Sequence, residues 1–366
     1  MKTSVAKIIA MVLSLVFIFS LIGCDEYSDY TTVTNVIDNY EDVDILDIFL
    51  EKGESYEVDF KEQFKDSGMD IKKIVSSSSD NNVFTVKNNK ITATGAGKAR
   101  LWVEIYNEIG KQRHFATAAY VYVFDVDNMI EVKTVQDLAN MNLNKTGNYI
   151  LKSDIDLAEW GDWEPIGNNP YGNEFKGMFV NPDSYIIKNL TISSATNIFH
   201  TPSGFCNGGL FGSINNAYID GIILENVFIN VTDFDGEFFS RAGGIAAYGI
   251  SSVIRNCKVN GIINSQIETG GIIGSDSWGR IISSSFKGTV KSEDEHVTVN
   301  RGSGGIAGHG YIVKDCHAEG TVDAFLIAGG IMGWATYEYY IFNSSFTGEL
   351  LNAQYKGEII GYWDYT

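Results

Sequence analysis

The stretch IRNCKVNGIINSQIETGGIIG, residues 254–274, contains the two phrases that organise most of the chain. The first phrase runs from an aliphatic residue to a glycine seven positions later, as from Ile254 to Gly261. It returns at 281–288, 313–320 and 341–348. The second is a Gly-Gly-aliphatic-x-Gly unit, Gly270 to Gly274, with related copies that start at 208, 243, 304 and 329 and a degraded copy at 357–361.

The distances between the copies indicate how the repeats pack. The starts at 208, 243, 270, 304 and 329 are separated by 35, 27, 34 and 25 residues. Constant phrases joined by variable lengths are typical of stacked coils with loops on one face. Each repeat is too short to bury its own apolar face, and propeller blades of about 40–45 residues are longer. We therefore predict a right-handed parallel β-helix, a solenoid, over residues 129–366.

Residues 45–127 show a different pattern, in which short alternating runs are separated by polar turns. The runs are at 56–60, 83–86, 90–93, 100–105 and 119–124. Period-two alternation with Asn and Gly breakers predicts an antiparallel β-sandwich. Asn88 and Asn89 are expected to form a hairpin turn because Asn tolerates positive φ.

Two family resemblances refine this all-β fold class. Residues 75–97, with the serine run, Ile91-Thr92-Ala93 and Gly95-x-Gly97, resemble the bacterial immunoglobulin-like domain of group 2. The Gly-Gly-aliphatic-x-Gly units and their lead-in at 135–179 resemble the GLUG repeats of bacterial adhesins and of the non-catalytic parts of IgA-cleaving metallopeptidases. The first resemblance implies an immunoglobulin-like β-sandwich that acts as a spacer or adhesion module without catalysis. The second implies that a β-helix follows it, and says little about activity.

The N-terminus is expected to direct the chain to the cell surface. Lys2 and Lys7 precede an apolar run from Ile8 to Ile22, which is short for a membrane span of about 20 residues. The run ends at Cys24 and resembles the lipobox of bacterial lipoproteins, which implies cleavage after residue 23 and lipid on Cys24. We thus expect a signal peptide at 1–23, an acidic tether at 24–44, and a lipid anchor on the extracellular face of the bacterial membrane.

Composition excludes several classes of function. The 366 residues carry a net charge of −19, whereas a nucleic-acid surface needs clustered Lys and Arg. We find no zinc-type cysteine spacing, no HExxH and no phosphate-binding glycine loop followed by Lys. We expect no cofactor and no nucleic-acid partner.

The cysteines of the repeat region are predicted to be free. Cys257 and Cys316 occupy equivalent positions two coils apart, hence roughly 9–10 Å apart, and a disulfide needs Cα atoms within about 7 Å. Cys206 has no partner in the repeat, so its state is left open. Before the repeats, Thr134 and Asp137 have the spacing of a helix start that could cover the open edge of the first coil.

The acidic residues nominate no catalytic pair. Asp154 and Asp156 share a strand face and are expected to be structural. Asp233, Asp235 and Glu237 match the first half of a calcium-loop spacing and then depart from it, so a solvated acidic loop and a weak Ca²⁺ site both stay open. Glycoside hydrolysis needs two carboxylates about 5–9.5 Å apart, and no spacing here indicates such a pair.

Aromatic residues follow the glycine units and are the best candidates for ligand binding. If the coils stack in register, they form a stripe along one edge of the solenoid. The candidate ligand-binding residues are Tyr248, Trp278, Tyr311, Trp334 and Tyr337. Flat aromatic faces beside polar groups suit sugar rings, whereas a self-stacking ladder that shields the edge is the structural alternative.

The sequence therefore predicts a surface-anchored, non-catalytic adhesion or glycan-binding protein. Its expected partners are the membrane, through lipid on Cys24, and a polysaccharide or a host or cell-surface protein. A β-helix polysaccharide lyase or glycoside hydrolase and a protein-binding surface scaffold are the alternatives.

Overall fold

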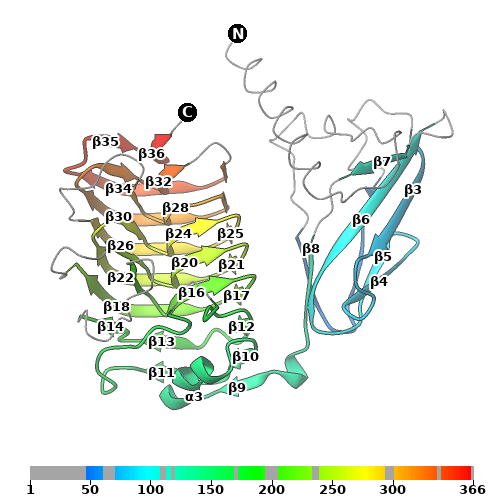
Figure 1. Cartoon of the computed structure of the whole chain (residues 1–366), viewed down its shortest axis with the longest axis horizontal. Helices are drawn as coiled ribbons and strands as arrows, with labels where there is room; N and C mark the ends of the chain where they lie inside the picture. Colours follow the sequence, from blue (N-terminus) through cyan, green and yellow to red (C-terminus); the bar gives the residue numbers. More distant parts are fainter. Residues whose placement is uncertain are drawn as a thin grey trace, which may run out of the picture. The chain divides into compact units, whose positions relative to one another are not determined.

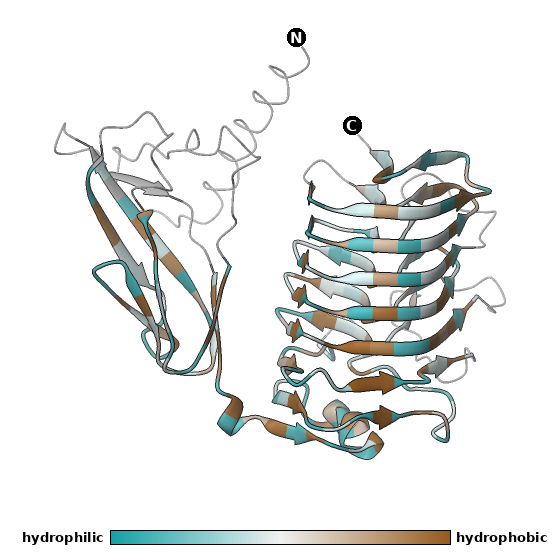
Figure 2. Cartoon of the chain, turned by 180° about the vertical axis from the view of Figure 1, so that it is seen from behind, coloured by the Kyte–Doolittle hydropathy of each residue, from teal (hydrophilic) through white to brown (hydrophobic). Residues whose placement is uncertain are grey.

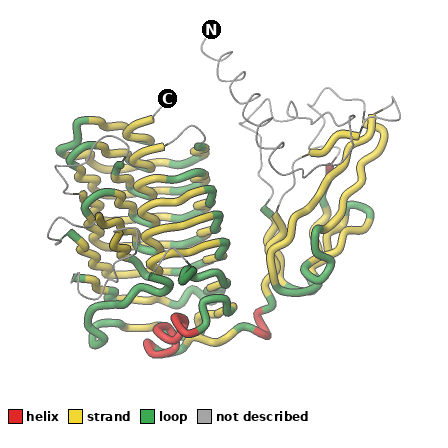
Figure 3. The backbone as a smooth tube through the Cα atoms, in the orientation of Figure 1, coloured by secondary structure: helices red, strands yellow, loops and turns green. Residues whose placement is uncertain are grey.

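We describe the chain from a computed structural model, which defines residues 47–60, 71–107, 113–116, 120–168, 172–193, 205–232, 239–292, 301–335 and 339–363. The chain divides into two compact units, Met1–Asn128 and Met129–Thr366 (Figure 1). Within these described ranges, strands dominate both units and the helical segments are short (Figure 3). No helix among these residues is long and apolar enough to cross a membrane.

In the unit Met1–Asn128, two sheets share one hydrophobic core. One sheet has the order β1-β8-β6-β3 with β7 beside β6, and the other has the order β2-β5-β4. The strands are β1 (Ile48–Glu51), β2 (Ser55–Glu57), β3 (Ile71–Ser78), β4 (Phe84–Lys87), β5 (Lys90–Ala93), β6 (Gly97–Asn107), β7 (Arg113–Ala116) and β8 (Tyr120–Phe124). Leu50, Phe84 and Leu101 bring side chains from both sheets into the core.

The hairpin turn predicted in this unit is confirmed. Strands β4 and β5 pair antiparallel with Lys87 opposite Lys90. Asn88 and Asn89 lie between them with φ angles of 52° and 65°. Asparagine is one of the few residues that adopt this left-handed conformation readily.

The unit Met129–Thr366 is a parallel β-helix whose stacked coils form four parallel sheets (Figure 1). The β9–β33 sheet contains β9 (Ile130–Val132), β10 (Asn148–Leu151), β12 (Met178–Val180), β17 (Tyr218–Asp220), β21 (Val253–Arg255), β25 (Arg280–Ile282), β29 (Ile312–Lys314) and β33 (Tyr340–Phe342). The β11–β34 sheet contains β11 (Ile155–Asp156), β13 (Ile186–Lys188), β14 (Thr191–Ile192), β18 (Ile223–Val231), β22 (Lys258–Ser265), β26 (Ser285–Ser292), β30 (His317–Ala324) and β34 (Ser345–Leu351).

The other two sheets are formed by the strands on either side of each glycine unit. The β15–β35 sheet contains β15 (Phe205–Gly208), β19 (Phe239–Gly243), β23 (Glu268–Gly270), β27 (Ser303–Gly304), β31 (Ile327–Gly329) and β35 (Tyr355–Gly357). The β16–β36 sheet contains β16 (Phe211–Asn215), β20 (Ala246–Ile250), β24 (Ile273–Ser277), β28 (Ala307–His309), β32 (Met332–Ala335) and β36 (Ile360–Trp363). Apolar segments recur along the stacked strands, as expected for a core shared between coils (Figure 2).

The constant glycine of the first phrase forms a column in the β11–β34 sheet. Gly261, Gly288, Gly320 and Gly348 pair with one another from coil to coil. A Cβ atom on Gly288 would lie 1.9 Å from the carbonyl oxygen of Gly261, so this column has no room for a side chain.

The phrase that ends at each of these glycines also carries the cysteines that the sequence predicts to be free. Cys257 and Cys316 alternate with Ser284 and Ser344 in one column, of which Cys257, Ser284 and Cys316 are buried and Ser344 is half-buried. The amide of Cys257 donates to Ser284 Oγ and the amide of Cys316 donates to Ser344 Oγ, each at 3.1 Å. Both thiols are free and buried, as predicted, and Cys206 is also free and buried.

The first glycine of each Gly-Gly unit lets strands of two neighbouring sheets approach with almost no space between their backbones. A Cβ atom on Gly243, at the end of β19, would lie 2.5 Å from Cα of Ile273 in β24. The second glycine makes room for a side chain of the neighbouring sheet, since a Cβ on Gly271 would lie 2.2 Å from the Phe286 ring. The β15–β35 and β16–β36 sheets therefore approach at backbone contact distance.

The helix start predicted at Thr134 is confirmed. Helix α3 (Val135–Asn140) is followed by the 3₁₀ segment η4 (Met141–Leu143), and another, η3 (Val126–Asn128), precedes β9. The Thr134 hydroxyl accepts from the Asp137 amide, and the Asp137 carboxylate accepts from the Thr134 amide. Leu138 is buried in the solenoid core, and α3 lies at the β9 end of the stack (Figure 1).

Candidate functional site

The aromatic residues that follow the glycine units separate into two columns rather than one stripe. The first column passes through equivalent positions of the β16–β36 sheet: Ser213, Tyr248, Ser275, His309, Trp334 and Tyr362. Tyr248 and Trp334 thus belong together, but Ser275 interrupts the aromatic run between them.

Side chains of the β15–β35 sheet pack against this first column. The Arg241 guanidinium lies 4.6 Å from the centre of the Tyr248 ring, and its Nε lies 3.8 Å from Glu268 Oε2. The side chains of Arg241 and Glu268 are only 10% and 12% exposed. The His309 and Trp334 rings are 4.6 Å apart. Burial lowers the pKa of His309, against the attraction of the Glu268 carboxylate.

The first column is therefore mainly a packing ladder between two sheets. Ser213 and Ser275 are buried, and the rings of Tyr248, His309 and Trp334 are only partly exposed. A ligand approaching from solvent would meet little free aromatic surface there. This agrees with the structural alternative weighed for Tyr248 and Trp334.

The second column begins at the corner between the β16–β36 and β9–β33 sheets and continues onto β33, and Trp278 is its most exposed member. The Trp278 and Tyr311 rings are 5.2 Å apart, Tyr311 meets Tyr340 edge to face at 5.9 Å, and Tyr340 stacks on Phe342 at 6.1 Å. Trp278 is 49% exposed. We call Trp278, Tyr311, Tyr340 and Phe342 the aromatic platform.

The backbone at Trp278 has an uncommon conformation for a tryptophan. Trp278 lies in the two-residue turn between β24 and β25 with a φ angle of 65°. Asn216 and Ser251 hold the same corner in the two preceding coils, with φ angles of 52° and 49°. The left-handed conformation costs an L-residue about 1–2 kcal/mol, and such strain is concentrated at functional sites.

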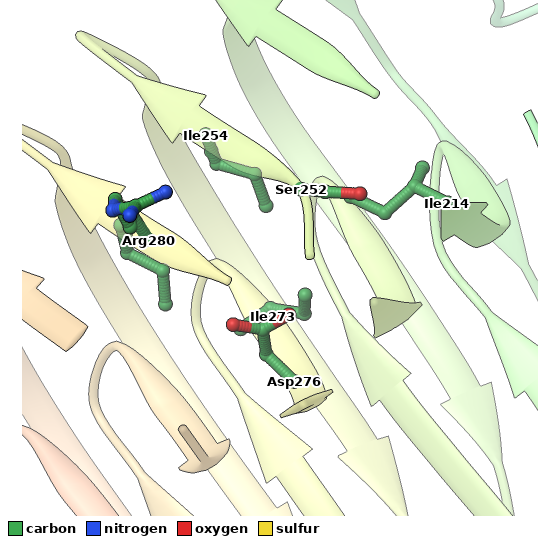
Figure 4. A pocket seen from close by; sticks show the side chains of 7 residues that line it. Ile214, Ser252, Ile254, Ile273, Asp276 and Arg280 are labelled. Atoms are coloured by element: carbon green, nitrogen blue, oxygen red, sulfur yellow. The ribbon is translucent and has the colours of Figure 1, made fainter. Parts of the chain in front are cut away.

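Asp276, two residues before Trp278, was not singled out from the sequence. Its side chain is 2% exposed and lies in a crevice too narrow to admit water, lined by Ile214, Ser252, Ile254, Ile273, Arg280 and Ile281 (Figure 4). Burial raises its pKa to about 7, although Gly279 and Arg280 act in the opposite direction. The signal in the sequence was that Asp276 occupies the position held by Ile214 and Gly249 in the two preceding coils.

The other polar candidates have structural partners. Asp154 accepts from the Ile186 amide at 2.8 Å, and Asp156 accepts from Ala158 and Asn189. Burial raises the pKa of the Cys316 thiol to about 12, so it holds no thiolate at neutral pH. In the described part of the chain, no three His, Cys, Asp or Glu side chains are grouped to hold a metal ion.

Several predicted site residues lie outside the described ranges. They are Cys24, Tyr337 and the candidate calcium ligands Asp233, Asp235 and Glu237. Of the five candidate ligand-binding residues, the structure therefore brings Trp278 and Tyr311 into one platform and places Tyr248 and Trp334 in the packing ladder. Tyr340 and Phe342 complete the platform and were not among those five.

Comparisons with known proteins assign neither a family nor an activity. No family model matches the chain. Halomucin from Haloquadratum walsbyi (strain DSM 16790 / HBSQ001) is 25% identical over 170 residues, which cover 44% of this chain and 2% of Halomucin. Among solved structures, IgA1 Protease superposes with a TM-score of 0.45 at 15% identity, covering 86% of this chain and 28% of that chain. The chain thus spans only a small part of either protein.

Proposed function

We propose that this chain is an extracellular bacterial surface protein, anchored by lipid on Cys24, that binds glycans without catalysis. The observation that carries the proposal is Trp278, which is half exposed, packed at a tilt against Tyr311 and held in a strained backbone conformation. The contact with Tyr311 stabilises the indole, but the left-handed backbone and the half-exposed ring oppose stability, so a role in recognition accounts for a tryptophan at this corner.

The spacing of the platform suits a linear sugar chain. Trp278, Tyr311 and Tyr340 come from three consecutive coils, which lie about 4.8 Å apart. Because Trp278 is tilted by 54° from Tyr311 and Tyr311 meets Tyr340 at 87°, successive sugar rings of an extended polysaccharide would contact faces and edges of the aromatic side chains in turn. Tyrosine hydroxyls and the indole N–H add polar groups at the rim of an apolar surface, as sugar rings require.

The resemblances and the N-terminal sequence support the location. A lipoprotein-type N-terminus and an acidic tether at 24–44 would hold the two folded units away from anionic lipid headgroups, because the chain carries a net charge of −19. The GLUG-type repeats and the immunoglobulin-like spacer belong, as resemblances, to proteins of the cell surface.

The test is a glycan array probed with the whole chain in detergent, including bacterial cell-wall polymers and host mucin glycans. Trp278→Ala is expected to weaken binding at least about tenfold, because truncation of an interface tryptophan costs about 2 kcal/mol. Trp160→Ala is the matched control, since Trp160 is 42% exposed but lies outside the platform. Trp334→Ala should have a smaller effect than Trp278→Ala.

Other outcomes would redirect the assignment. Release of shortened sugar products would favour a polysaccharide lyase or glycoside hydrolase. Failure to bind any glycan would overturn the proposal and favour a protein-binding scaffold. Repeating the array with a calcium chelator tests the candidate ligands Asp233, Asp235 and Glu237 separately.

A further inference from the structure

Asp276 is a buried carboxyl group beneath the turn that presents Trp278. It lies on β24 with its side chain among Ile254, Ile273 and Ile281 (Figure 4). Neither carboxylate oxygen makes a hydrogen bond of ordinary geometry to any described residue. The Gly279 backbone and Arg280 favour the ionised carboxylate, but its burial disfavours that form more strongly.

Two glycines enclose this carboxyl group. A Cβ atom on Gly279 would lie 2.3 Å from both oxygens of Asp276, and a Cβ on Gly249 of the preceding coil would lie 2.7 Å from Oδ1. Gly279 is itself the second residue of the Trp278 turn. The carboxyl group therefore rests directly against the backbone of the turn, and a change in its position must move that backbone.

The ends of the turn are held firmly, so its middle is the part that can yield. Ser277 accepts a backbone hydrogen bond from Ser251 at 2.8 Å, and the Arg280 amide donates to Ser252 at 2.9 Å. Between these two bonds, Trp278 has the strained φ angle of 65°. Strain of this kind persists only where the surroundings enforce it.

The charged groups near Asp276 are few. Arg280, on β25, is the charged side chain that lines the crevice. From β20 and β16 only Gly249 and Ile214 face the carboxyl group, and Ser252 and Ile254 face it from the β21 side. On β28, His309 pairs with Ser275, the residue before Asp276. Burial raises the pKa of Asp276 to about 7, against the attraction of Arg280.

We propose that Asp276 is a positioning residue for Trp278, and that loss of its proton releases the Trp278 turn. The protonated acid fits the dry crevice and supports the turn from below. The ionised acid gains most by moving towards solvent, and the adjoining turn is the shortest path to it. The platform is then presented in acidic to neutral solution and disturbed in mildly alkaline solution.

Fluorine NMR of the whole chain labelled with fluorotryptophan tests this inference without a ligand. The chain has six tryptophans, and loss of one signal in Trp278→Phe identifies that of Trp278. The Trp278 signal is expected to shift with a midpoint near pH 7. In Asp276→Asn, which imitates the protonated acid, it should stay near its low-pH position at every pH. Glu225→Gln, which removes an exposed carboxylate of β18, is the control and should titrate like the parent.

Two results would overturn the proposal: a Trp278 signal that does not titrate, or a titration that persists in Asp276→Asn. Trp334 serves as an internal reference because it lies beside His309, and its own response should be the same in parent and variant. If Asp276→Asn does not fold, the parent is titrated alone and hydrogen exchange is measured at the Trp278 and Gly279 amides. Release of the turn must speed exchange of these two amides above pH 7, relative to amides at other corners.

That the pH controls glycan binding rests on the proposed function, but the movement of the Trp278 turn does not. A chain that titrates as expected and binds no glycan would retain the role of Asp276 and lose the glycan assignment. A chain that binds glycans with the same affinity from about pH 5 to 9, and whose Trp278 signal is constant, would retain the glycan assignment and lose the role of Asp276.

Discussion

Trp278 is exposed and its backbone is strained, two properties that oppose stability. In the two preceding coils the same corner is occupied by Asn216 and Ser251. Both fit the left-handed region better than a bulky aromatic residue does. This departure from the neighbouring coils is the reason why we propose a binding role for Trp278. Neither the φ angle nor the exposed fraction of Trp278 could be read from the sequence.

We expect Trp278→Asn to be more stable than Trp278→Ala by about 1 kcal/mol. Both variants lose the indole and its contact with Tyr311, so their difference isolates the backbone strain. Urea unfolding of the two variants measures it. Equal stability would show that the turn imposes no strain on residue 278.

Asp276 is expected to make stability depend on pH. Its pKa is raised from 3.8 to about 7 in the folded chain, so its contribution is fully present below about pH 4 and is lost as the pH rises through 7. The loss corresponds to at most about 4 kcal/mol, at 1.36 kcal/mol for each unit of pKa. Asp276→Asn should match the parent at pH 4 and exceed its stability at pH 8.

Urea unfolding at several pH values checks this prediction. His309 acts in the opposite sense, because its lowered pKa removes stability as the pH falls, but it does so equally in parent and variant. A parent and an Asp276→Asn variant that stay parallel from pH 4 to 8 would contradict the assignment of a raised pKa to Asp276.

At the scale of the element, the phrase from Ile254 to Gly261 forms the end of β21, the corner that follows it and the first half of β22. Asn256 takes the left-handed corner with a φ angle of 52°, Cys257 points inward and Gly261 passes the neighbouring coil at close range. The buried Cys and Ser side chains each satisfy an amide of the coil before them, so either residue serves in this column. That explains why cysteines appear in the column without forming a disulfide.

Gly288→Ala is predicted to destabilise the solenoid by at least about 3 kcal/mol, because its methyl group would overlap the Gly261 carbonyl and force the coils apart. Gly161→Ala is the control. Gly161 has a φ angle of 84° but open space around it, so the change should cost only about 1 kcal/mol. Thermal unfolding followed by circular dichroism compares them, and similar losses would mean that backbone conformation, not coil contact, explains the glycine column.

At the scale of the whole molecule, the two units have separate hydrophobic cores. Leu50, Phe84 and Leu101 belong to one core, and Leu138, Ile254 and Val313 belong to the other. In a solenoid each coil rests on its neighbours, so damage to one coil is transmitted along the stack but not to a separate core.

We therefore expect two unfolding transitions in calorimetry. Gly288→Ala should lower the midpoint of one transition and leave the other within about 1 °C, since a change of 1 kcal/mol moves the midpoint of a domain by several degrees. Leu101→Ala, which truncates a side chain in the other core, should do the reverse. A single transition that both variants lower equally would contradict separate cores.

Much of the solenoid could be predicted because its signals are local and repeated. The alternation of strand residues, the left-handed corner at Asn256 and the glycine column each repeat at fixed offsets, so one coil predicts the next. The capping box at Thr134 and the hairpin at Asn88 and Asn89 are equally local, and both are confirmed. The prediction of a single aromatic stripe was less accurate. Trp278 comes three residues after Ser275, the position equivalent to Tyr248, and this difference moves its ring from the β16–β36 sheet to the corner.

The sequence by itself determined a parallel stack of coils, its glycine and cysteine columns, and the presence of aromatic residues near one edge. Only the tertiary structure decided that Tyr248 and Trp334 lie in the β16–β36 sheet while Trp278 stands half exposed at a corner beside Tyr311, and that Asp276 lies buried beneath the Trp278 turn. The physical reason is that alternation and turn preference act within a few residues. Exposure and pKa depend instead on which backbone and side chains of the neighbouring coils surround a group.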